Sequence, residues 1–127
     1  MNNRGQSLIS FVLIIPIILM ILFMVYDIGN MVLLREKLDN INYIAIDYGL
    51  DKIEDLDLNA KLNELIKKNK DDIEVVNISI SEGKIRITLE DRLNNKFSLI
   101  SKFKTFTIKS SYIGYMENDK KVIRKDK

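Results

Sequence analysis

The sequence predicts an α+β fold in which a long N-terminal helix packs on a short second helix and a small antiparallel sheet of about three strands. Three observations lead to this prediction. The N-terminal region is an uninterrupted apolar run, the next region repeats apolar residues at helical spacing, and the C-terminal half alternates apolar and polar residues. A chain of 127 residues is long enough for one small domain of this kind.

A membrane span is the first predicted element. Residues 8–26 read LISFVLIIPIILMILFMVY and contain no charged side chain. A helix of this length covers roughly 28 Å, close to the thickness of a bilayer core, which is about 30 Å. Membrane helices tolerate a proline such as Pro16. We therefore predict a transmembrane helix over residues 6–26. A cleaved signal peptide is the alternative, but its apolar region is usually shorter, and residues 27–30 do not form a small-residue cleavage site.

The same helix is expected to continue beyond the membrane over residues 27–48. Apolar residues recur there at alternating spacings of three and four, which places them in one stripe: Met31, Leu34, Leu38, Ile41, Ala45 and Tyr48. We predict one helix over residues 6–48, apolar in its first half and amphipathic in its second. Two helices that meet at Gly29 are the alternative, because an isolated glycine weakens a helix prediction.

A small domain over residues 49–116 is expected to follow. After an acidic turn, residues 58–69 form a short amphipathic helix capped by Asp57. Strands are predicted over residues 73–81, 84–90 and 104–115. A two-residue turn between the first two strands aligns three apolar pairs: Ile80 with Ile85, Ile78 with Ile87, and Val76 with Leu89. The polar residues 117–127 are expected to form a frayed tail.

The composition limits the chemistry that the chain can carry out. Without Cys or His, it has no thiol nucleophile, imidazole base, disulfide or Cys/His zinc site. A net charge of +2 is small for a nucleic-acid-binding protein. Glu54, Asp55 and Asp57 lack the spacing of a calcium loop and are interpreted as a solvated turn. The hydroxyl-rich residues 110–112 are interpreted as strand. We therefore expect no enzyme activity, no cofactor, no bound metal and no nucleic-acid partner.

The N-terminal residues resemble a known family, the TadE-like pseudopilins, which are minor pilins of tight-adherence (Flp) pili and are related to type IV pilins. The residues that carry the resemblance are Gly5, Gln6, Phe11, Pro16, Asp27 and Gly29. The last two resemble the acidic residue and the glycine that end the family's membrane segment. Asp27 has two readings, a functional acidic site or the polar end of the span at the membrane interface, and we favour the second.

The resemblance implies that residues 1–5 are a leader, which a prepilin peptidase removes on the cytoplasmic side between Gly5 and Gln6. It also implies a pilin-like fold and a single membrane span with the C-terminal domain outside the cytoplasm, at the cell surface or in a pilus. The implied partners are the lipid bilayer, other pilins or pseudopilins, the prepilin peptidase and the pilus assembly platform. The expected function is a structural or assembly component of a type IV or Flp-type pilus or a secretion-like system, with a role in adhesion or secretion.

Ser10 departs from the family pattern. Most members carry Glu at this fifth position of the mature chain, where it is thought to pair with the N-terminal amine of a neighbouring subunit. Serine cannot form that ion pair, so fibre assembly by the usual mechanism is in question. The alternative function is a membrane-anchored binding or accessory module that does not enter a fibre. Processing after Gly5 distinguishes the two functions.

Overall fold

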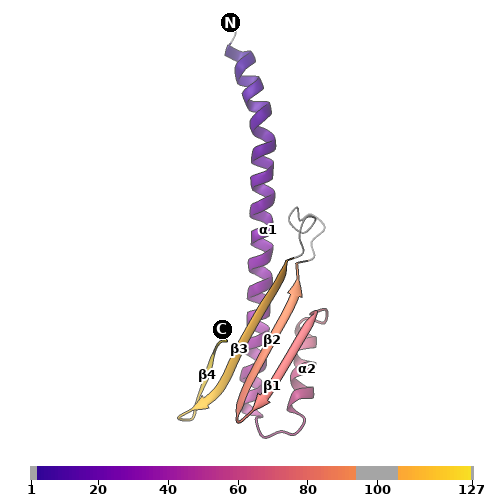
Figure 1. The fold of residues 1–127 in the computed structure, drawn as a ribbon, viewed down its shortest axis with the longest axis vertical. Helices are drawn as coiled ribbons and strands as arrows, with labels where there is room; N and C mark the ends of the chain where they lie inside the picture. The colour runs from indigo at the N-terminus through magenta and orange to yellow at the C-terminus, as the bar shows by residue number, and fades with distance from the viewer. Residues whose placement is uncertain (1–2, 94–105, 127) are drawn as a thin grey trace.

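The computed structural model describes residues 3–93 and 106–126. Its elements, in chain order, are α1 (Asn3–Asp51), α2 (Leu58–Asn69), β1 (Val75–Ser81), β2 (Lys84–Arg92), β3 (Thr107–Glu117) and β4 (Lys120–Lys125). Figure 1 shows that the first half of α1 projects away from the other elements, while its second half lies beside the sheet. The predicted α+β architecture is confirmed.

The helix α1 is continuous from Asn3 to Asp51, a little longer than predicted. The alternative of two helices meeting at Gly29 is therefore wrong. Residues 3–26 are all exposed, whereas the predicted apolar stripe turns toward the domain. Leu38 and Ala45 are completely buried in it, and Ile41 is nearly so. The amphipathic half of α1 thus supplies one side of the core.

The four strands form one antiparallel sheet in the order β1-β2-β3-β4. The register predicted for the first hairpin is confirmed, because Ile80, Ile78 and Val76 lie opposite Ile85, Ile87 and Leu89. The turn residues Glu82 and Gly83 have φ angles of 51° and 75°. Two positive φ angles are what a tight two-residue hairpin turn requires, so the hairpin closes without a bulge.

The predicted frayed tail is wrong, because residues 120–125 form β4 and pair with β3. The sheet therefore has four strands rather than three and extends beyond residue 116. A second two-residue turn at Asn118 and Asp119, with φ angles of 51° and 63°, connects β3 to β4. The strand before it begins at Thr107, and residues 104–105 of the predicted third strand lie outside the described residues.

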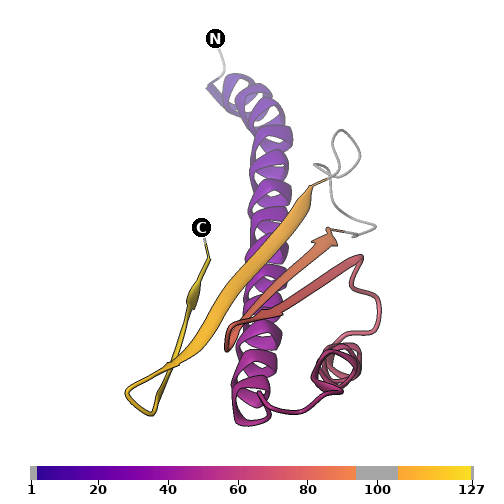
Figure 2. The ribbon, with the colours of Figure 1, turned by 60° about the horizontal axis from the view of Figure 1, so that its bottom comes forward.

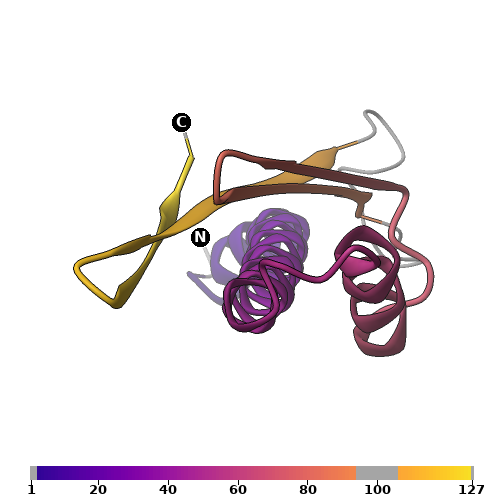
Figure 3. The same ribbon diagram turned by 90° about the horizontal axis from the view of Figure 1, so that it is seen from below.

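The sheet covers α1 and α2 from one side, which makes a two-layer structure (Figures 2 and 3). The apolar core lies between the layers and comprises Leu38, Ile41, Ala45, Ile46, Leu50, Leu58, Leu62, Ile66, Ile85, Ile87, Leu89 and Ile108. Helix α2 buries the apolar face that its sequence predicts. Its expected cap is wrong in detail, since the Asp57 side chain makes no capping hydrogen bond. Instead the backbone N–H of Asp57 donates to Asp55 Oδ1 at 3.0 Å.

Candidate functional site

The projecting half of α1 is the most distinctive surface of the molecule. It is long and apolar enough to cross a membrane once, and its most apolar stretch has no buried residue. Large side chains such as Phe11 (62% exposed) cover it on all sides. A soluble domain does not normally expose apolar side chains all round one helix, whereas a bilayer provides an environment for them.

Five of the residues singled out in the sequence lie on this projecting half: Gly5, Gln6, Ser10, Phe11 and Pro16. They are spread along the exposed helix, and the folded domain does not bring them together. A β-carbon built at Gly5 would have no atom within 4 Å, so packing within the protein does not require a glycine at this position. Pro16 lies inside the helix, which continues through it.

Asp27 and Gly29 mark the junction between the projecting half and the domain, but they lie on different sides of α1. Asp27 is completely buried. Its position at the end of the span, at the membrane interface, stays a prediction. Gly29 is exposed and has open space around it. The burial of the helix by the domain therefore begins at Asp27.

A buried polar contact joins α1 to the middle of the sheet, and the sequence analysis missed it. Asn42 is completely buried, and its Nδ2 donates to the carbonyl oxygens of Ile87 at 2.9 Å and Ser110 at 3.2 Å. The Ser110 hydroxyl in turn donates to Asp39 Oδ1 at 2.6 Å. Lys125 of β4 lies 3.7 Å from the other oxygen of Asp39. This chain of contacts fixes how α1 crosses the central strands.

The C-terminal end of α1 is tied to the edge strand β4. Lys121 Nζ lies 2.9 Å from Asp47 Oδ1 and 2.8 Å from Asp51 Oδ1. Hydrogen bonds to Asp51 and Asp47 raise the pKa of Lys121, because both favour its charged form. Two inward-facing lysines of β4, at positions 121 and 125, therefore serve as contacts to the helix, which explains how so polar a segment becomes a strand.

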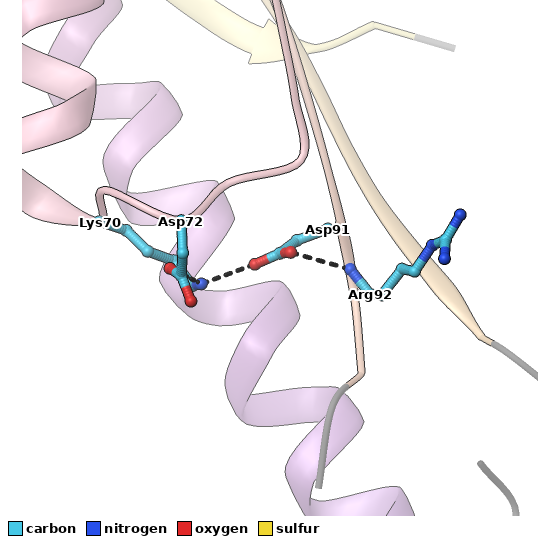
Figure 4. A network of polar contacts seen from close by, with 4 residues as sticks. All are labelled: Lys70, Asp72, Asp91 and Arg92. Atoms are coloured by element: carbon cyan, nitrogen blue, oxygen red, sulfur yellow. Dashed lines mark hydrogen bonds and ion pairs between the residues drawn. The ribbon is translucent and has the colours of Figure 1, made fainter. Parts of the chain in front are cut away.

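An open recess of about 530 Å³ lies between α1, the end of α2 and the ends of β1 and β2. Figure 4 shows four of its charged residues. Lys70 Nζ lies 2.6 Å from Asp91 and 2.5 Å from Asp72, and the backbone N–H of Arg92 donates to Asp91. Burial opposes the charge on Lys70, but the hydrogen bonds to Asp72 and Asp91 outweigh it and raise the pKa of Lys70. The Lys70 hydrogen bond lowers the pKa of Asp72.

These charged groups bind one another and hold α2 against β2. Arg92 also pairs with Glu74, at 2.9 Å between Nε and Oε2. The charged residues that line the recess are thus paired with one another. In the part of the chain that the structure describes, no group of three or more acidic side chains is placed to hold a metal ion.

The domain half of α1 also exposes apolar side chains on the side turned away from the sheet. They are Ile28, Val32, Leu33, Tyr43 and Ile44, each about half exposed or more. The polar residues Glu36 and Asn40 lie between them and are exposed as well. The apolar surface of the projecting half therefore continues, interrupted by polar residues, along the back of the domain.

Comparison with known proteins adds no family to this geometry. No protein-family model matches the chain, and no curated protein or solved structure matches it either.

Proposed function

We propose that this chain is a membrane-anchored pseudopilin of the TadE-like type, a structural or assembly component of a type IV or Flp-type pilus or of a secretion-like system. One observation carries the proposal. A single helix projects an exposed apolar half, and its second half packs across a small antiparallel sheet. The resemblance at Gly5, Phe11 and Pro16 supports the same function.

In this proposal the apolar half of α1 lies in the bilayer and the domain lies outside the cytoplasm. A rigid helix shared by both parts transmits the position of the anchor to the domain without a flexible linker. The domain has the polar contacts of a stable fold, such as those of Asn42 to the sheet. Its surfaces are then available for contacts with other pilins and with the assembly platform.

Ser10 favours a second candidate, an anchored accessory module that does not enter a fibre. A carboxylate at this position would supply a partner for a neighbouring amine, and serine supplies none. Both candidates use the same anchor. They differ in maturation, because only a pseudopilin is a substrate of a prepilin peptidase.

The decisive experiment is the intact mass of the full chain from cells that contain an active prepilin peptidase. We expect a mature form that begins at Gln6. Gly5→Leu should block this maturation and leave membrane insertion unchanged, because the span is intact. Gly29→Leu is the matched control, since it alters an exposed glycine of the same helix and should be processed normally. A wild-type chain that retains Met1 in such cells would count against the pseudopilin and favour the accessory module.

A further inference from the structure

The outer face of the sheet, which points away from α1, is basic with an apolar centre. Among the described residues, its six basic side chains are Lys84, Arg86, Arg92, Lys109, Lys120 and Arg124, and its three acidic ones are Glu90, Glu117 and Asp126. Lys84 and Arg124 lie over the ring of Tyr115, at 5.7 and 5.8 Å from its centroid. The partly buried Ile113 and Val122 adjoin them on β3 and β4.

Four of the six basic side chains, those of Lys84, Lys109, Lys120 and Arg124, are exposed and form no ion pair with another described residue. Arg86 is paired with Asp126 at 2.7 Å, and Arg92 is paired with Glu74. Lys84 and Arg124 are the two that flank Tyr115. We call the surface formed by Lys84, Ile113, Tyr115, Val122 and Arg124 the basic patch.

The turn between α1 and α2, residues 52–57, has the opposite character. Leu56 at its tip is 100% exposed, and the neighbouring Glu54 and Asp57 are also exposed and form no ion pair among the described residues. Asp55 holds the turn in place, because it accepts hydrogen bonds from Lys61 and from the backbone N–H of Asp57. The turn therefore presents one leucine between two carboxylates on an ordered backbone.

We propose that the 52–57 turn of one copy docks on the basic patch of a neighbouring copy. Leu56 would contact Tyr115 and Val122, while Glu54 and Asp57 would approach Lys84 and Arg124. Opposite charges around an apolar contact are the arrangement that gives an interface its orientation. The exposed Leu56 matches the apolar residues at the centre of the basic patch. An acidic polymer would need only the basic residues, so these apolar residues favour the turn of a second copy as the partner.

The fold places the two surfaces where neighbouring anchored copies can join them. Both lie at the end of the molecule opposite the N-terminus, where α1 ends and the strand turns are located (Figure 1). The sheet occupies one side of the molecule, and the two helices that flank the turn occupy the other (Figure 3). Copies standing in parallel in one membrane would have the turn and the patch at the same height.

This contact joins two different surfaces, so it is heterologous and builds a row or a ring of copies. Anchoring in one membrane raises the effective concentration of the surfaces, which lets a small contact suffice. The inference rests on the anchoring part of the proposed function. It does not depend on N-terminal processing or on entry into a pilus.

The test uses disulfide cross-linking of the full chain in membranes, since the natural sequence contains no Cys. The double variant Leu56→Cys/Val122→Cys should form a ladder of dimers, trimers and larger species on oxidation with copper phenanthroline. Leu56→Cys alone should remain monomeric. Strong dimers from that single variant would indicate a symmetric contact and overturn the proposal. A ladder of equal strength from Leu56→Cys/Lys68→Cys, whose second cysteine lies on α2, would show random collision and also overturn it.

Charge exchange tests the orientation. Adding Glu54→Lys and Asp57→Lys to the cross-linking variant should lower the ladder by about tenfold, since like charges would then face one another. Adding Lys84→Glu and Arg124→Glu as well should restore it, and failure to restore it would contradict the proposed pairing. Carbonate extraction of the same membranes separates the two hypotheses. If the protein resists extraction but forms no ladder, the proposed contact between copies is wrong and the membrane anchor stands. If carbonate extracts the protein, the membrane anchor on which the contact depends is wrong.

Discussion

Gly114 of β3 lies directly against the side chain of Ile46 on α1. A β-carbon built at position 114 would be 2.1 Å from Ile46 Cγ2, far below any van der Waals contact. Gly114 is buried at this point, where the strand crosses the helix. The close crossing therefore requires a residue without a side chain.

We expect Gly114→Ala to destabilise the domain by about 1–3 kcal/mol, because the helix and the strand must move apart. Thermal or denaturant unfolding in detergent, followed by circular dichroism, measures the loss. Gly29→Ala is the control: it lies in open space on the same helix and should be neutral or stabilising. Ile46→Ala combined with Gly114→Ala should cost less than the sum of the two single variants. Additive losses would show that these two residues do not clash.

The buried Asn42 gives a second prediction. Asn42→Ala removes the hydrogen bonds to Ile87 and Ser110 and leaves a cavity, so it should reduce the free energy of unfolding by about 1–3 kcal/mol. The exposed Asn40, on the same helix, is the matched control, and Asn40→Ala should change stability by no more than about 0.5 kcal/mol. Equal effects of the two variants would mean that the contact with the sheet contributes nothing.

The first hairpin was predictable in register because its apolar residues share one face in only one alignment. The hydrogen bonds of Asn42 could not be predicted in this way, since their acceptors Ile87 and Ser110 are 45 and 68 residues away along the chain. The one indication in the sequence was that Asn42 is a polar residue directly beside the apolar stripe of the helix. Glycine within a strand is a signal of close backbone approach, so Gly114 could also have been singled out.

The strand β4 was missed for a related reason. Its inward positions 121 and 125 are lysines, so the segment lacks the apolar alternation that identifies a half-buried strand. Asp47, Asp51 and Asp39 on α1 provide the opposite charges that make those positions favourable. The burial of Asp27 likewise depends on tertiary packing, and periodicity alone placed it at the end of the apolar run.

The 52–57 turn should weaken in acid. The hydrogen bond from Lys61, together with the one from the Asp57 backbone, lowers the pKa of Asp55 below its usual 3.8. A lowered folded-state pKa means that this contribution to stability is present above pH 3.8 and is lost as the pH falls through the folded value. The stability difference between the wild type and Asp55→Asn should therefore shrink below about pH 4.

Unfolding curves of both proteins over the acid range measure this difference. Asn59→Ala, at an exposed position that carries no titratable group, is the control and should give a difference that does not change with pH. If the stability difference between the wild type and Asp55→Asn stays constant down to the most acidic pH at which the protein folds, the contacts of Asp55 do not contribute to stability.

The topology of the proposed anchor can be tested with a single cysteine. Ser81 lies exposed at the end of β1, so Ser81→Cys should leave the fold intact. If the domain is outside the cytoplasm, an impermeant thiol reagent should label this variant in intact cells whose wall admits the reagent. The wild type, which has no Cys, gives the background. Labelling only after lysis would place the domain in the cytoplasm.

Ser10 supplies the last prediction, because it separates the two candidate functions. It lies on the exposed surface of the projecting half of α1, near the start of the apolar run. An acidic residue costs about 2.5–3.5 kcal/mol at the centre of a span and less toward its ends. For an anchored component outside the fibre, we expect Ser10→Glu to cause a modest loss of membrane-inserted protein and no gain in filaments. Ser7→Glu, closer to the end of the helix, should cost less still.

Shearing surface filaments from cells that carry each form, and blotting the sheared and membrane fractions, measures both quantities. The reason for the expected result is that the carboxylate introduced by Ser10→Glu would face lipid without a neighbouring amine to pair with. A main fibre subunit behaves in the opposite way, since the new carboxylate restores the partner of that amine. Abundant wild-type protein in the sheared fraction would exclude the non-fibre function. A further increase with Ser10→Glu would show that the missing carboxylate limits assembly.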